Sequence, residues 1–163
     1  MTTKLQSDRL SLVPMTREDA LAMVEALSPE DRAHVSDDWL EKVRSSPPDD
    51  PWTFGFTMVL RETGERVGSC GFNGPPKDGM VEIAYGVDPQ HQGKGYATEA
   101  ASAMVYFAFN HGLVKTVCAH TFPEKNASGQ VLTKCGFRIM GEINDPEEGL
   151  VWRWEKVRDK PAK

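Results

Sequence analysis

The sequence predicts a single α/β domain with a mixed sheet flanked by helices. The first observation is the order of strand-like and helix-like segments, which reads β-α-α-β-β-β-α-β-α-β-β. The second is a glycine-bearing loop around Gly93 and Gly95, which stands between a strand-like and a helix-like segment. The third is the length of 163 residues, which suits one domain with a sizeable core.

The first part of the chain is expected to form a strand and two helices. Residues 10–13 have a strand pattern that Pro14 ends, and Thr16 then suits a helix N-cap, with Asp19 as its imperfect capping-box partner. Residues 37–43 suggest a second short helix. The proline-rich residues 45–51 read as a loop that is too short to link two domains.

The rest of the chain alternates between strands and helices. Residues 52–61 and 66–72 are predicted strands joined by a turn that contains Gly64. In residues 81–87 bulky side chains alternate with small ones, apart from Glu82, so one face of this strand is bulky and the other is open. The remaining predicted elements, in order, are helix 99–110, strand 113–121, helix 126–134, strand 137–142 and strand 150–154.

Composition and charge argue against several functional classes. The net charge of −5 and the pI near 5.4 are unlike a general nucleic-acid binder, which carries a basic stripe. No apolar run approaches the length of a membrane span, and residues 1–6 lack the apolar core of a signal peptide. An acidic surface mildly favours a cationic substrate.

The cysteines indicate a reducing compartment. Cys70, Cys118 and Cys135 are an odd number and lack the spacing of a metal site. We therefore expect no metal, a cytoplasmic location, and three small buried side chains, none of them placed as a covalent carrier of an acyl group.

The glycine loop has the layout of an anion-binding site. A helix N-terminus directs unpaired N–H groups and positive dipole toward an anion, and Gly93 and Gly95 let a phosphate approach the main chain. The loop is not G-x-x-x-x-G-K-[ST], because no glycine lies five residues before Gly93 and no Ser or Thr follows Lys94. It is not G-x-G-x-x-G, because Thr98 occupies the last position. It reads Gln-x-x-Gly-x-Gly from Gln90.

This loop resembles the acyl-CoA pyrophosphate loop of the GNAT superfamily of N-acyltransferases. A second block, residues 119–137, with Asn126-Ala127-Ser128 inside it and Gly136-Phe137 at its end, is similar to the branch that contains ribosomal-protein N-terminal (Rim-type) acetyltransferases. Residues 7–12 are similar to the first strand of that branch. The resemblance spans about residues 5–154 and implies the GNAT fold, a mostly antiparallel central sheet flanked by helices. It implies one acyl-CoA N-acyltransferase domain over residues 5–157, followed by a flexible tail at 158–163.

The resemblance implies acetyl-CoA as co-substrate and a set of residues that bind it. Main-chain groups of the strand before the loop would polarise the thioester carbonyl, the loop would bind the pyrophosphate, and Asn126 would contact the CoA arm. These residues are Tyr85, Gly86, Val87, Gln92, Gly93, Lys94, Gly95, Tyr96, Ala97 and Asn126. The alternatives are a helix-entry turn without a ligand at the loop, a solvent-facing Lys94, and a plain helix cap at Asn126. His91 is expected to be a surface residue of the loop.

Two residues are candidates for catalysis. Glu82 is a lone carboxylate on a central strand, where it lies near a substrate cleft or pairs with a buried base, and the family often has a general base there. The alternative is a structural Glu at an exposed strand end. Many family members carry a Tyr proton donor one turn before the Gly-Phe pair, where this chain has Thr133. Ser128 is the substitute that the resembled branch implies, and its alternative role is a helix cap.

Several aromatic residues have two readings. Trp39, Trp52, Phe54 and Phe72 would line an acceptor pocket or belong to the core, and packing is the more common role of aromatic residues at strand spacing. Trp152 and Trp154 share one face of the last strand and have the same two readings.

The favoured hypothesis is an N-acetyltransferase in which a primary amine attacks acetyl-CoA directly. The acceptor is a protein N-terminus or a small amine, with no nucleic-acid or membrane partner, and the protein is a monomer or a homodimer. The alternatives are a non-catalytic acyl-CoA-binding or sensing module on the same fold and, less favoured, a nucleotide-phosphate binder.

Overall fold

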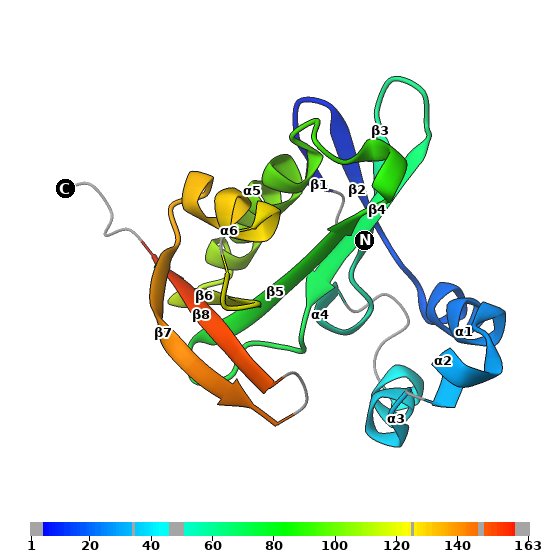
Figure 1. Ribbon diagram of the computed structural model, residues 1–163. Coiled ribbons are helices and arrows are strands. Elements are labelled where there is room, and N and C mark those ends of the chain that lie inside the picture. Colours follow the sequence, from blue (N-terminus) through cyan, green and yellow to red (C-terminus); the bar gives the residue numbers. More distant parts are fainter. Residues whose placement is uncertain (1–4, 34, 46–50, 125, 147–148, 159–163) are drawn as a thin grey trace.

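The computed structural model describes residues 5–33, 35–45, 51–124, 126–146 and 149–158. Within these ranges the strands form one sheet in the order β1-β2-β3-β4-β5-β6-β8-β7 (Figure 1). Neighbouring strands are antiparallel except β5 and β6, which are parallel. The predicted α/β class and mostly antiparallel mixed sheet are therefore confirmed.

The elements have the following bounds. The strands are β1 (Leu5–Gln6), β2 (Leu10–Pro14), β3 (Phe56–Leu60), β4 (Arg66–Phe72), β5 (Met80–Val87), β6 (Thr116–Thr121), β7 (Arg138–Asp145) and β8 (Gly149–Val157). The helices are α1 (Arg17–Ala26), α2 (Pro29–Ala33), α3 (Asp37–Ser45), α4 (Pro51–Phe54), α5 (Tyr96–Phe109) and α6 (Ala127–Lys134), with a short 3-10 helix η1 (Pro89–His91).

Several predicted boundaries were wrong; β7, for example, extends to Asp145 and β8 to Val157. Three of the differences have a local reason. The strand expected over 52–61 begins only at Phe56, because Gly55 has a φ of +73° and separates it from α4. The helix expected from residue 99 begins at Tyr96, since Gly95 in the left-handed region is already its N-cap. The strand expected from residue 113 begins at Thr116, after a turn in which the Val114 N–H donates to His111. The elements β1, α2, α4 and η1 were not predicted.

Helix α5 covers one face of the central strands. Its buried residues Ala100, Ala101, Met104 and Ala108 belong to the same core cluster as Val81 and Ile83 of β5. Figure 1 shows α5 and α6 together on one side of the sheet. Because side chains alternate along a strand, Glu82 lies on the face of β5 turned away from α5.

Helices α1 to α3 form a separate group at the other side of Figure 1. The capping box of Thr16 and Asp19 is complete at the start of α1, with hydrogen bonds of 3.0 and 3.2 Å. A small cluster of Ala20, Val43 and Phe54 joins α1, α3 and α4. Of the predicted loop 45–51, residues 46–50 lie outside the described residues.

Two of the three cysteines are buried, as predicted. Cys70 and Cys118 are buried, and burial raises the pKa of the Cys70 thiol to about 12 and that of Cys118 to about 11, so both remain protonated. The expectation of burial is wrong for Cys135, which is half-buried, with its Sγ 3.3 Å from Ser102 Oγ. All three are free thiols.

Neither a membrane span nor a metal-ligand cluster is found in the described ranges. None of their helices combines the length and the apolar character needed to cross a bilayer. Their His, Cys, Asp and Glu side chains do not converge in threes. The predicted tail lies outside the described residues except for Arg158, which donates to the Lys115 and His111 carbonyl oxygens.

Candidate functional site

Strands β5 and β6 separate halfway along their length. Their pairing runs only from Met80–Thr116 to Glu82–Cys118, although β5 continues to Val87 and β6 to Thr121. On its other edge β5 stays paired with β4 as far as Val87. The second half of β5 therefore has an edge that faces a gap instead of a neighbouring strand.

The main-chain N–H and C=O groups of alternate β5 residues point into the gap between β5 and β6. The Glu82 carbonyl accepts from the Asn73 N–H, and the Asp88 N–H donates to the Val67 carbonyl, so even-numbered positions face β4. In an extended strand the N–H and C=O of one residue point to the same edge, and successive residues alternate. The N–H groups of Tyr85 and Val87 therefore face the gap.

The glycine loop follows β5 and opens onto the first turn of α5. Gly93 has a φ of +78° and Gly95 a φ of +88°, a region that L-residues with a side chain rarely adopt. Gly95 is the N-cap of α5 and makes no side-chain cap hydrogen bond. The N–H groups of the first helical residues, from Tyr96 onward, have no carbonyl partner within the helix, so they can bind an anion.

A cleft of about 410 Å³ joins this loop to the gap. Its walls come from the end of β5, the glycine loop, the start of α5 and one side of α6. Among the predicted cofactor-binding residues, those that line it are Tyr85, Gly86, Val87, Gln92, Gly93, Gly95, Tyr96 and Ala97. Lys94 is exposed and does not line the cleft, and the Gln92 side chain donates to the Val87 carbonyl at 2.9 Å.

A polar cluster of Ser7, Arg9 and Glu99, here called the latch, holds the glycine loop from the N-terminal part of the chain. The Glu99 carboxylate accepts from the Ser7 hydroxyl at 2.6 Å, from the Arg9 N–H at 3.0 Å and from the Arg9 guanidinium. The same guanidinium donates to the Lys94 carbonyl at 2.8 Å and lies 4.6 Å from the centre of the Tyr96 ring. Residues about 90 positions apart thus fix the strand turn, the loop and the start of α5 to one another.

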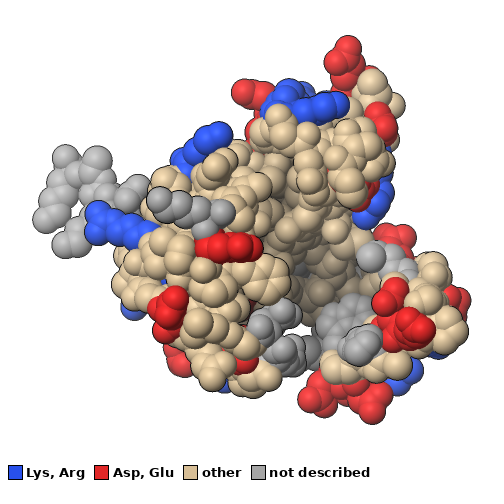
Figure 2. Space-filling model, in the orientation of Figure 1, with Lys and Arg blue, Asp and Glu red and all other residues tan. Residues whose placement is uncertain are grey.

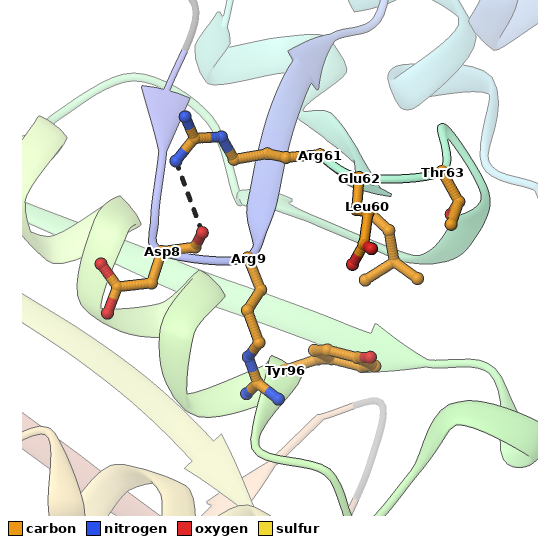
Figure 3. Close-up of a pocket in the computed structure, with 7 residues that line it drawn as sticks. All are labelled: Asp8, Arg9, Leu60, Arg61, Glu62, Thr63 and Tyr96. Atoms are coloured by element: carbon orange, nitrogen blue, oxygen red, sulfur yellow. Dashed lines mark hydrogen bonds between the residues drawn. The ribbon is translucent and has the colours of Figure 1, made fainter.

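Figure 3 shows the outer side of this latch, where a cavity of about 460 Å³ lies between Arg9, Tyr96 and the β3–β4 turn. Its charged lining residues are of both signs: Asp8, Arg9, Arg61 and Glu62. The Arg61 guanidinium donates to the main-chain carbonyls of Ser7 and Asp8, at 3.0 and 3.4 Å. This side of the loop is therefore used for structural contacts.

The latch predicts a pH-dependent contribution to stability. Although partial burial opposes it, the hydrogen bonds from Ser7 and Arg9 hold the pKa of the Glu99 carboxyl below its ordinary value. A depressed carboxyl pKa stabilises the fold above the unfolded-state pKa, and the contribution is lost as pH falls through the folded-state pKa. Glu99→Gln should therefore lower the free energy of unfolding by about 1 kcal/mol at neutral pH.

Urea unfolding of the wild type and Glu99→Gln, at neutral pH and at a pH well below the ordinary carboxyl range, measures this difference. The two proteins should converge in stability at acid pH, since Glu99 is then neutral in both. A difference that stays constant with pH would show that the latch acts through packing alone.

On the face of the sheet away from α5, Glu82 pairs with a histidine. Glu82 Oε2 lies 2.8 Å from Nδ1 of His120, with side-chain exposures of 29% for Glu82 and 17% for His120. The register explains the pairing, because His120 lies two residues beyond Cys118, the parallel partner of Glu82. Of the two alternatives for Glu82, pairing with a base and lying at a cleft, the structure shows both.

A second cleft, of about 400 Å³, opens at this pair. It is lined by Asn73, Glu82, His120, Thr121, Phe122, Asn126, Ser128, Asp145 and Val151. Ser128 lines both this cleft and the one that contains the glycine loop. The two clefts therefore meet at Ser128, beside the gap between β5 and β6.

At the start of α6, Asn126 and Ser128 were each predicted either to cap the helix or to act in the site. Asn126 is the N-cap and accepts from the Gly129 N–H at 2.9 Å, so its cap role is present, and its side chain lines the second cleft instead of the first. Ser128 is exposed and is not the cap. Its main-chain carbonyl accepts from the Tyr85 hydroxyl at 3.2 Å. Burial raises the pKa of Tyr85 well above its ordinary value.

Other predicted residues are structural. The expectation that His91 lies at the surface is wrong, because it is only 8% exposed and its Nε2 lies 3.1 Å from Glu65. Thr133 Oγ1 donates to the Gly129 carbonyl of its own helix.

The aromatic residues pack mainly in the core. Trp52 is partly buried, with ring centroids 4.7 Å from Phe72 and 5.4 Å from Phe107, and Phe54 is buried. Trp154 is buried and Trp152 is half-buried. The Trp39 side chain lies outside what the structure describes.

His120 was not predicted as a site residue, although it lies inside the second block. A lone histidine in a strand carries no motif, and only the parallel register of β5 and β6 places it beside Glu82. Asp145, in the second cleft, was also missed, since it stood in a predicted loop. The Glu82–His120 pair could have been predicted only by recognising that residues 81–87 and 116–121 form neighbouring parallel strands.

Comparison with known proteins gives consistent matches. Residues 9–138 match the family model of the acetyltransferase (GNAT) domain. An uncharacterized N-acetyltransferase, p20 of Bacillus licheniformis, is 32% identical over 94 residues, which are 57% of this chain and 53% of p20. The match thus spans about half the length of this relative, as it does for YjdG of Bacillus subtilis (strain 168), at 33% identity over 50% of this chain and 49% of YjdG.

Solved structures share the fold at low sequence identity. A ribosomal-protein-S5-alanine acetyltransferase from Vibrio fischeri superposes with a TM-score of 0.72 and 15% identity, over 98% of this chain and 100% of that one. RimL, a ribosomal L7/L12 alpha-N-protein acetyltransferase solved in complex with coenzyme A, gives a TM-score of 0.68 and 17% identity, over 95% and 98% of the two chains.

Proposed function

The chain belongs to the GNAT acetyltransferase family, and from this premise we propose that it transfers an acetyl group from acetyl-CoA to a primary amine by direct attack. One observation carries the proposal. A cleft with an anion-binding helix end and a second cleft with a Glu–His pair meet at Ser128, where β5 and β6 separate. Such a junction brings a phosphate-bearing acyl donor and an amine together from two sides.

The cleft at the glycine loop, from here on called the donor cleft, suits each part of acetyl-CoA. The N–H groups at the start of α5 and in the glycine loop would bind the pyrophosphate. The free edge of β5 would hold the pantetheine arm, and Gly86 has open space where a side chain would stand. The gap-facing N–H groups of Tyr85 and Val87 would donate to the thioester oxygen as negative charge develops on it.

The second cleft suits a cationic amine. Its charged lining residues, Glu82 and Asp145, are carboxylates, and neither Lys nor Arg lines it among the described residues. Figure 2 shows Asp and Glu side chains over the α1–α3 group; the acidic residues of these helices include Glu18, Asp19, Glu30, Asp31, Asp37 and Asp38. Negative potential raises the local concentration of an ammonium substrate. The Glu82–His120 pair would take the proton from the ammonium.

Ser128 is proposed to protonate the departing CoA thiolate. Its position at the meeting point of the clefts supports this role, and Asn126 already caps the helix. Ser128→Ala should lower kcat by about 100-fold or more, the usual contribution of one positioned proton donor, and leave acetyl-CoA affinity within about twofold. Steady-state kinetics with calorimetric titration measures the two effects. A kcat equal to that of the wild type would remove Ser128 from the chemistry.

The proposed function itself is tested in two steps. Calorimetric titration with acetyl-CoA, with ATP as the control ligand, should show micromolar binding of acetyl-CoA alone. A panel of small amines and N-terminal peptides should then release CoA thiol and yield acetylated product. Tight acetyl-CoA binding without turnover of any amine would favour the non-catalytic acyl-CoA-binding module. Binding of ATP in place of acetyl-CoA would contradict the assignment of the loop.

A further inference from the structure

The histidine of the Glu82–His120 pair has one ring nitrogen engaged and one free. Nδ1 lies 2.8 Å from Glu82 Oε2, and Nε2 is buried yet makes no hydrogen bond with any described residue. A buried polar atom without a partner is costly, so such an atom beside a cleft indicates a missing ligand or water. His120 lines the same cleft as Glu82 and Ser128.

The pairing decides which nitrogen can accept a proton. An ionised carboxylate only accepts hydrogen bonds, so the Nδ1 that faces Glu82 carries the hydrogen. The neutral ring then has its lone pair on Nε2, the atom without a partner. A base whose second nitrogen is held by a carboxylate is the arrangement by which proteins fix a histidine in its reactive tautomer.

We propose that His120 is the proton acceptor of the amine-acetylation reaction and that Glu82 is its positioning residue. The inference rests on the proposed function and refines it, because the lone carboxylate predicted from the sequence becomes the partner of the base. Glu82 holds the ring in the Nδ1–H tautomer and stabilises the imidazolium that forms. Nε2 takes the proton from the substrate, directly or through one water.

Atoms and charges balance across the reaction. The substrate ammonium gives one proton to His120 Nε2, and the freed amine attacks the thioester carbonyl carbon, so that a C–N bond forms. The tetrahedral intermediate collapses, the C–S bond breaks, and CoA leaves as a thiolate. The Ser128 hydroxyl gives its proton to the thiolate and takes the second proton of the nitrogen in its place, and the imidazolium returns its proton to solvent. The net products are an amide, CoA thiol and one released proton.

Other charged groups face His120 from the neighbouring strands. On β8 its register partner is Arg153, which hydrogen-bonds to Glu155 Oε2 at 2.7 Å. Cys118 stands two residues earlier on β6, and Asp145 of β7 lines the same cleft. Glu82, Asp145 and Glu155 thus place negative charge near the ring, and Arg153 is paired with Glu155.

The test compares three variants of the full chain with the wild type, using an amine that the wild type acetylates. His120→Asn keeps an N–H donor near Glu82 and removes the basic nitrogen, so kcat should fall by about 100-fold or more while calorimetry shows unchanged acetyl-CoA affinity. Glu82→Gln can still accept from Nδ1–H, but its amide can also hold the ring in the other tautomer, so its kcat should fall as well, by up to about 10⁴-fold. His120→Gly should regain activity when imidazole is added to the assay.

The outcomes separate this proposal from the proposed function. If the wild type acetylates an amine and His120→Asn retains its kcat, His120 is not the acceptor and the function stands. A wild-type kcat in His120→Asn together with a large loss in Glu82→Gln would make Glu82 itself the base. If the wild type acetylates no amine, the proposed function fails first. Circular dichroism of each variant checks that the fold survives.

Discussion

Gly95→Glu should abolish acetyl-CoA binding while the protein stays folded. Gly95 is the N-cap of α5 and has a φ of +88°, and a Cβ there would lie 3.0 Å from Arg9 Nη2, so a side chain would push against the guanidinium that holds the Lys94 carbonyl and would displace the glycine loop at the helix end. A glutamate also adds negative charge beside that helix end, which opposes the binding of phosphates. We expect affinity to fall by about 100-fold or more, equivalent to about 3 kcal/mol, in a calorimetric titration.

The matched control is Gly149→Glu. Gly149 has a φ of +81°, close to that of Gly95, and a Cβ there would meet no atom within 4 Å. It lies at the β7–β8 turn, away from the glycine loop. Both variants should lose about 1–2 kcal/mol of stability from the left-handed backbone, and only Gly95→Glu should lose binding. Equal acetyl-CoA affinity in the two variants would remove the loop from the donor site.

Gly68→Ala should destabilise the fold strongly, although it adds only one methyl group. A Cβ at Gly68 would lie 2.2 Å from the Gly86 carbonyl oxygen and 3.0 Å from the Val87 Cα, both of them main-chain atoms. Strands β4 and β5 pair at this point, so relief of the clash requires the ladder to move apart. We expect a loss of about 2–4 kcal/mol in the free energy of unfolding, measured by urea denaturation.

Gly86→Ala is the informative counterpart, since the Gly86 site is open and lines the donor cleft. It should keep stability within about 1 kcal/mol of the wild type. Its methyl group would enter the space proposed for the pantetheine arm and weaken acetyl-CoA binding about tenfold.

For Gly68→Ala, a free energy of unfolding equal to that of the wild type would show that β4 and β5 can move apart without cost at Gly68.

The boundaries that the sequence predicted best are those with a local chemical cause. The capping box at Thr16 and the strand before the glycine loop follow from residues a few positions apart. The boundaries predicted worst depend on backbone geometry that residue type alone does not specify. Gly55, for example, ends α4 in a left-handed conformation, although the residues around it have a strand composition.

The α/β class, the family, and the loop that would bind the donor could be predicted from the sequence. These depend on short segments whose glycine, polar and apolar positions act within a few residues of each other. Glu82 and Ser128 were identified in the same way, each as a single residue with two alternative roles.

The contacts that these residues make could not be predicted from the sequence. Glu82 meets His120 across 38 positions, and Glu99 meets Arg9 across 90, through strand register and helix packing. Strand register is set by hydrophobic burial and pairing over the whole sheet, so no local pattern encodes it. Motifs report local chemistry, whereas the Glu82–His120 pair and the latch depend on contacts between segments far apart in the chain.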